Sequence, residues 1–100
     1  MTLSDYQQAA TATMNVALSR EGQMMDGASG IAEEAGEVLA HVRKHQFLGR
    51  ELDAERLKEE LGDVLWCIAA VATSAGFDLD DVARFNLEKL RRRHAAVGAP

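Results

Sequence analysis

The chain contains a single cysteine, Cys67, among its 100 residues. One cysteine cannot form an intramolecular disulfide, so we expect a reduced, cytoplasmic compartment. Basic residues are also few, because 11 lysines and arginines stand against 16 aspartates and glutamates, for a net charge of −5. A nucleic-acid-binding surface is normally basic, so nucleic acid is not expected as a partner.

Long apolar runs are absent as well. No run approaches the eighteen or so residues that cross a bilayer, and the polar N-terminus lacks the apolar segment of a signal peptide, so no membrane partner is expected. Strand-like alternation is missing, which predicts an all-α fold. The 47% of hydrophobic residues suffice for one domain over residues 1–100, but with little margin, and oligomerisation would help.

Capping and turn residues divide the chain into four predicted helices. They span about residues 4–18, 29–46, 53–75 and 78–93. Ser4 with Gln7 forms a capping box, Asp53 is an N-cap, Gly76 is a C-terminal cap residue, and Asp78 with Asp81 caps the last helix.

The connections between these helices are also predicted from composition. Residues 20–30 hold three glycines and are expected to form a loop, and residues 95–100 to form a flexible tail. Short connections favour antiparallel neighbours, so the expected architecture is a four-helix bundle.

One pattern occurs twice, as IAEEAGEVLAHV at 31–42 and LKEELGDVLWCI at 57–68. In each copy two acids three residues apart border an apolar helical stripe, Glu34 and Glu37 in the first and Glu60 and Asp63 in the second. If the helices pack antiparallel, the four carboxylates can converge, and such like charge requires protons or metal ions. Oxygen-only ligands favour Mg²⁺, for which Mn²⁺ can substitute.

The repeat also contains a glycine pair and a pair of outer glutamates. Gly36 and Gly62 recur at matching places, which indicates close approach of the helices there. Glu33 and Glu59 lie farther from the apolar stripe, so we expect them to face solvent, with an indirect role at the metal as the alternative.

Histidines and aromatic residues allow two interpretations each. Glu37, His41 and His45 lie at i, i+4 and i+8 and could ligate a transition metal, although a packing role is favoured for His41. Tyr6 and Trp66 could stack on a nucleotide base, but lone aromatic residues in helices usually serve packing.

The predicted fourth helix carries a line of side chains that changes from apolar to basic. Apolar residues at 79, 82 and 85 are followed on the same face by Asn86, Lys89 and Arg93. A cationic line in register with a core face is expected to point toward the carboxylates or toward a phosphate beside them.

The segments GIAEEAGEVLAHVRK, EELGDVLW and NLEKLRRR together resemble the MazG-like all-α nucleoside triphosphate pyrophosphohydrolases, whose signature is ExxE followed after a spacer by ExxD. The resemblance covers about residues 30–93 and implies one module that forms homodimers or homotetramers. It also implies Mg²⁺ held by both acidic pairs, and phosphate contacts from Asn86 and Lys89.

The activity implied by the resemblance is hydrolysis of a (deoxy)nucleoside triphosphate to the monophosphate and pyrophosphate. A metal-activated water would attack the α-phosphorus, with Glu37 or Glu33 as proton acceptor. Lys89 and Arg93 would stabilise the departing pyrophosphate. Residues 20–30 show no pattern that selects a particular base.

Two alternatives remain open at this point. Phosphoribosyl-ATP pyrophosphohydrolase of histidine synthesis looks similar, but its usual Lys before the Glu-Glu pair and His after the second motif are not found here. A non-catalytic helical assembly module would use the acids as a solvated rim. Thermal stabilisation by Mg²⁺ would separate this module from either enzyme.

Overall fold

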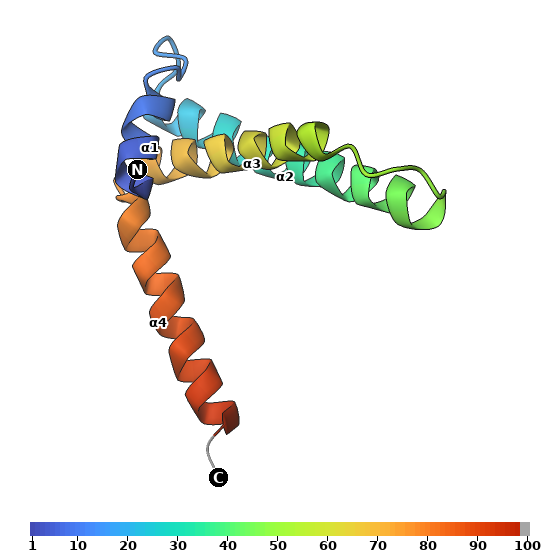
Figure 1. The fold of residues 1–100 in the computed structure, drawn as a ribbon. Coiled ribbons are helices and arrows are strands. Elements are labelled where there is room, and N and C mark those ends of the chain that lie inside the picture. Colours follow the sequence, from blue (N-terminus) through green and yellow to red (C-terminus); the bar gives the residue numbers. More distant parts are fainter. Residues whose placement is uncertain (99–100) are drawn as a thin grey trace.

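The computed structural model describes the backbone of residues 1–98 and the side chains of residues 1–95. It contains four helices, α1 (Leu3–Thr11), α2 (Arg20–Phe47), α3 (Ala54–Ala75) and α4 (Leu79–Gly98). No strand occurs in this part of the chain, which confirms the all-α class. Helices α2 and α3 form a long hairpin, and α1 lies at the end opposite the hairpin's loop (Figure 1).

Helix α4 leaves the hairpin instead of packing along it (Figure 1). It is bent by 103° from α3, and it contacts α1 and α3 but not α2. The radius of gyration is 16.5 Å, whereas about 13 Å is usual for a compact chain of 100 residues. A single chain is therefore more open than a closed four-helix bundle.

No helix within residues 1–98 is by itself both long and apolar enough to cross a membrane. Helices α3 and α4, taken together through Ala95 as one bent pair, do meet that test of length and composition.

Helix α1 is shorter than predicted and is capped by a different residue. The capping box is formed by Thr2 and Asp5, each side chain bonding the other's backbone N–H at 3.0 and 3.1 Å. The predicted pair, Ser4 and Gln7, instead contacts other helices. The helix ends at Thr11, where threonine hydroxyls bond backbone carbonyls, rather than near residue 18.

The loop predicted at residues 20–30 is wrong, because α2 already begins at Arg20 with Ser19 as its N-cap. Two of its glycines, Gly27 and Gly30, serve close packing instead of a turn. A Cβ on Gly27 would lie 2.9 Å from a methyl group of Val71, and one on Gly30 would lie 2.6 Å from the sulfur of Cys67. Glycine therefore lets α2 and α3 approach closely at this end of the hairpin.

The close approach predicted at Gly36 and Gly62 is wrong within one chain. A Cβ at either position would meet nothing within 4 Å, and both residues are exposed. They lie on open sides of the hairpin.

The remaining helix ends agree in part with the predictions. Asp53 caps α3, and Gly76 ends it with φ of 81°, as expected. Asp78 caps α4 by accepting from the N–H of Asp80, whereas Asp81 binds Arg84 instead of capping. Helix α4 continues to residue 98, so the flexible tail predicted from residue 95 is wrong for residues 95–98. Residues 99–100 lie outside the described part.

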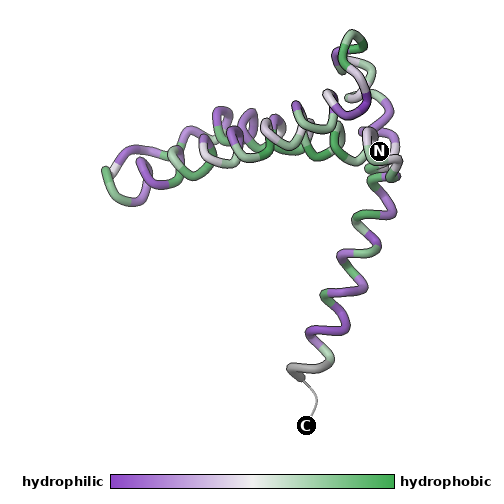
Figure 2. Tube along the Cα trace, turned by 180° about the vertical axis from the view of Figure 1, so that it is seen from behind, coloured by the Kyte–Doolittle hydropathy of each residue, from purple (hydrophilic) through white to green (hydrophobic). Residues whose placement is uncertain are grey.

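The core is small and built from short side chains. Cys67, Ala69, Ala70 and Ala72 of α3 are buried, as is Leu79 at the start of α4. Large apolar side chains remain exposed along the hairpin and α4, including Leu39, Phe47, Leu61, Phe77 and Phe85. Hydrophobic residues alternate with hydrophilic ones along α4, although it has few neighbours (Figure 2). The hairpin and α4 thus carry apolar side chains that no other described part of the same chain covers.

Candidate functional site

The close contacts between α2 and α3 set the register of the two acidic pairs. Gly30 lies against Cys67. Since the helices are antiparallel, four residues onward on α2 and four back on α3 bring Glu34 level with Asp63. Three more residues onward on α2 and three more back on α3 bring Glu37 level with Glu60. The repeated pattern therefore places its acids on facing helices.

Burial and the neighbouring acids raise the pKa of Glu34. Its pKa is raised, first by burial and then by repulsion from Glu37, Asp63, Glu33 and Glu60. All four neighbours are therefore within electrostatic range of Glu34. Glu34 is half-buried, whereas Glu33, Glu37 and Asp63 are exposed.

The negative field reaches the core and α1. Burial raises the pKa of the Cys67 thiol, and Glu34 and Asp63 raise it further. Burial also raises the pKa of Tyr6 on α1, with Asp63 as the next cause. The charge of Asp63 is therefore within electrostatic range of α1.

Glu60 is the only member of the two acidic pairs that is buried, with 5% of its surface exposed. Its Oε1 lies 2.7 Å from Nδ1 of His41, whose side chain is 12% exposed. An ionised carboxylate only accepts hydrogen bonds, so the ring nitrogen donates. The sequence predicted a packing role for His41 and missed this contact with a predicted ligand.

The Glu37, His41 and His45 alternative finds no support. His41 is turned to Glu60, and Nδ1 of His45 lies 2.7 Å from the backbone carbonyl oxygen of Arg50. Among the residues whose side chains are described, no three His, Cys, Asp or Glu side chains are grouped closely enough to hold an ion as they stand.

A cavity of about 400 Å³ lies at the loop end of the hairpin, beside the acids. It is lined by Glu37, Ala40, His41, Lys44, His45, Arg50, Glu51, Asp53, Arg56 and Glu60. Lys44, Arg50 and Arg56 form no ion pair with any side chain in the described part. No sequence motif singled out these cations, although Lys44 lies two helical turns after Glu37 and thus near its face.

The basic line of α4 does not reach the acids within one chain. Asn86, Lys89 and Arg93 are exposed on a helix that points away from the hairpin (Figure 1). Val82 and Phe85, expected on the core face, are 40% and 74% exposed. The expectation that this line faces the carboxylates is thus not met by a single copy.

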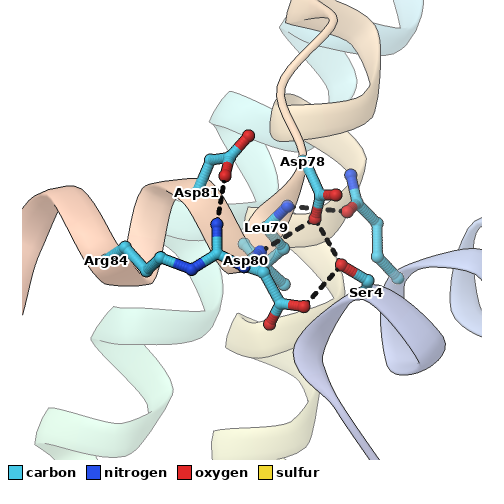
Figure 3. A network of polar contacts seen from close by, with 7 residues as sticks. Ser4, Asp78, Leu79, Asp80, Asp81 and Arg84 are labelled. Carbon is cyan, nitrogen blue, oxygen red and sulfur yellow. Dashed lines mark hydrogen bonds and ion pairs between the residues drawn. The ribbon is translucent and has the colours of Figure 1, made fainter.

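The direction of α4 is set by polar contacts at its first turn (Figure 3). The single hydroxyl hydrogen of Ser4 is shared between the carboxylates of Asp78 and Asp80, and Arg84 pairs with Asp81. The hydrogen bond from Ser4, together with the N–H of Asp80, lowers the pKa of Asp78.

Gln7 of α1 adds three hydrogen bonds at the same junction. Its amide nitrogen donates to the hydroxyl of Thr73 and to the carbonyl of Phe77, and its oxygen accepts from the N–H of Leu79. Helix α1 therefore joins the end of α3 to the start of α4.

Both aromatic residues considered for base stacking have packing roles in this structure. Tyr6 packs against the core cluster of Ala69, Ala72 and Leu79. The indole N–H of Trp66 donates to the carbonyl of Ala10 and the hydroxyl of Thr13. Both contacts fasten α1 to α3.

The donor set of the acidic region fits a hard divalent cation. Glu34, Glu37, Glu60 and Asp63 offer only carboxylate oxygens, which Mg²⁺ and Mn²⁺ prefer. Burial and then repulsion from the neighbouring acids raise the pKa of Glu34, and a bound cation would relieve that repulsion.

Comparisons with known proteins found similar sequences. The family model for the MazG nucleotide pyrophosphohydrolase domain matches residues 26–98, which hold most of α2 and the whole of α3 and α4. The uncharacterized protein YvdC of Bacillus subtilis (strain 168) is 37% identical over 73 residues, which cover 63% of this chain and 68% of YvdC. No solved structure matches the chain.

Proposed function

Because the chain belongs to the MazG nucleotide pyrophosphohydrolase family, we propose that it hydrolyses (deoxy)nucleoside triphosphates to the monophosphate and pyrophosphate. The observation that carries the proposal is the α2–α3 register set by the Gly30–Cys67 contact, which couples Glu34 to the acids of both motifs across the interface. That coupling accounts for the recurrence of one acidic pattern on two helices. A solvated rim on a non-catalytic module would not require acids from two helices to approach one another.

Mg²⁺ is the proposed cofactor, held by Glu34, Glu37, Glu60 and Asp63, and Mn²⁺ can replace it. When bound, the ion neutralises phosphate charge and lowers the pKa of a water. The acids alone would repel a triphosphate, so the proposed reaction depends on a divalent cation.

The chain's own residues position the substrate and move the proton. Glu37 and Glu33 are exposed and form no ion pair in the described part, so both are candidates to accept a proton from the water that attacks the α-phosphorus, Glu37 in addition to its proposed role as a ligand. The oxygen that leaves the α-phosphorus remains on pyrophosphate, whose charge Lys89 and Arg93 would stabilise, with Asn86 as a hydrogen-bond donor.

A second copy of the chain is proposed to complete the site. Helix α4 diverges from the acids of its own chain, and apolar side chains are exposed on both the hairpin and α4. A homodimer, or a dimer of dimers, would cover these faces and could bring α4 of one copy to the acids of another. A monomeric mass by light scattering at micromolar concentration would contradict this part of the proposal.

The activity is tested by measuring pyrophosphate release from a panel of ribo- and deoxyribonucleoside triphosphates and phosphoribosyl-ATP, with and without Mg²⁺. We expect Mg²⁺-dependent release from at least one nucleoside triphosphate. Release from phosphoribosyl-ATP alone would favour the histidine-synthesis alternative. No release from any substrate, with no thermal stabilisation by Mg²⁺, would favour the non-catalytic module.

A further inference from the structure

The contact between His41 and Glu60 joins the two acidic motifs directly. His41 lies one helical turn after Glu37 on α2, and Glu60 belongs to the second motif on α3. Their side chains meet at 2.7 Å, and both are largely buried. No other ion pair links α2 to α3 in the described part of the chain.

Burial makes this contact important for Glu60. A buried carboxylate without a hydrogen-bond donor is costly, and it would turn toward any donor or solvent within reach. His41 supplies a donor from a helix that packs tightly on α3 at Gly27 and Gly30. The donor therefore holds one carboxylate oxygen in a fixed direction.

We propose that His41 is a positioning residue that, through its hydrogen bond to Oε1 of Glu60, orients this carboxylate so that its other oxygen binds the divalent cation. The inference rests on the proposed function for the ion itself. Ligating carboxylates are commonly held by such hydrogen bonds, and loss of the donor typically weakens metal binding about 10- to 100-fold. His41 touches neither substrate nor ion in this role.

The opposite role for His41 would be to block Glu60. In that case the ring would compete with the cation for the carboxylate, and removing the ring would strengthen binding. A role in packing alone would make the shape of the side chain matter and its donor irrelevant. These three roles predict different orders of metal affinity among variants of one residue.

The test measures Mn²⁺ affinity by electron paramagnetic resonance of the free ion, without substrate, for His41→Asn, His41→Gln and His41→Leu. Asparagine places an amide N–H where Nδ1 of histidine lies, glutamine places it farther out, and leucine keeps bulk without a donor. We expect about 10- to 100-fold weaker Mn²⁺ binding in the Gln and Leu variants, with the Asn variant within a few-fold of wild type.

The matched control is His45→Ala, one turn further along α2, whose ring bonds a backbone carbonyl instead of an acid. It should leave Mn²⁺ affinity unchanged. Equal or tighter binding in the Gln and Leu variants would overturn the proposal. If the Leu variant does not fold, the order of Asn and Gln decides the matter. Absence of Mn²⁺ binding in the wild-type protein would overturn the proposed function itself, which separates the two failures.

Discussion

Gly30 of α2 and Cys67 of α3 are so close that a Cβ on the glycine would lie 2.6 Å from the cysteine sulfur. This contact holds the hairpin in the register that brings Glu34 level with Asp63. Packing at one end of the hairpin therefore determines the geometry of the acids in its middle.

Gly30→Ala is expected to lower stability by about 1–3 kcal/mol, because the added methyl overpacks the contact. The measurement is the free energy of unfolding by urea. Cys67→Ala removes the clashing sulfur, so the double variant should lose less than the sum of the two single variants. Gly36→Ala is the control. Its Cβ meets nothing within 4 Å, and it should gain about 0.5–1 kcal/mol in a helix interior.

Glu34→Gln should abolish pyrophosphate release while raising the melting temperature of the metal-free protein. The folded chain raises the pKa of Glu34, so this group favours folding at low pH and loses that contribution as the pH rises through its folded value. A neutral amide removes the repulsion, and its advantage should therefore grow from acidic to neutral pH. Glu55→Gln, in the first turn of α3, is the control. Joint loss of fold and activity in Glu34→Gln would contradict a metal site.

The apolar periodicity and the caps of α3 could be predicted because they depend on neighbours in sequence. Asp53 and Gly76 act on their own helix, and both predictions are confirmed. The glycines could not be assigned in the same way. Glycine serves both turns and close packing, and only the partner helix shows that Gly27 and Gly30 belong to the second class.

The acidic pairs could be predicted because their spacing and phase repeat, whereas His41 could not be linked to Glu60. That contact depends on the exact rotation of two helices about their axes. The direction of α4 could not be predicted from the sequence pattern either. It is set by Ser4, which reaches Asp78 from the other end of the chain, and helical periodicity carries no information about such a contact.

Ser4→Ala should lower the melting temperature at neutral pH, and the difference should shrink as the pH falls. The hydroxyl holds the pKa of Asp78 below its usual 3.8, so its stabilisation is complete above that value. It is lost as the pH falls through the lower folded value. Melting curves of both proteins from about pH 7 to about pH 2 measure the effect. Ser29→Ala on the exposed side of α2 should show no such pH dependence.

The last prediction concerns α4 and the second copy of the chain. Lys89→Ala should lower activity on every accepted nucleotide by a similar factor, about ten- to a thousand-fold, because all candidate substrates share the phosphates. Glu60→Gln should also be inactive through loss of a proposed ligand. Arg91→Ala is the control and should keep its activity, because Arg91 is exposed and lies two residues from Lys89, on the other side of the helix.

Mixing the two inactive variants then shows whether a working site takes Lys89 from the same chain as Glu60 or from another copy. Within one chain α4 points away from Glu60 (Figure 1), so a working site would take Glu60 from one copy and Lys89 from another. After subunits are exchanged, half of the sites in a mixed dimer regain both residues, and about a quarter of the wild-type rate should return. No recovery, in mixtures shown to exchange subunits, would mean that both residues act within the same chain. A loss confined to one base in Lys89→Ala would instead place Lys89 beside the base.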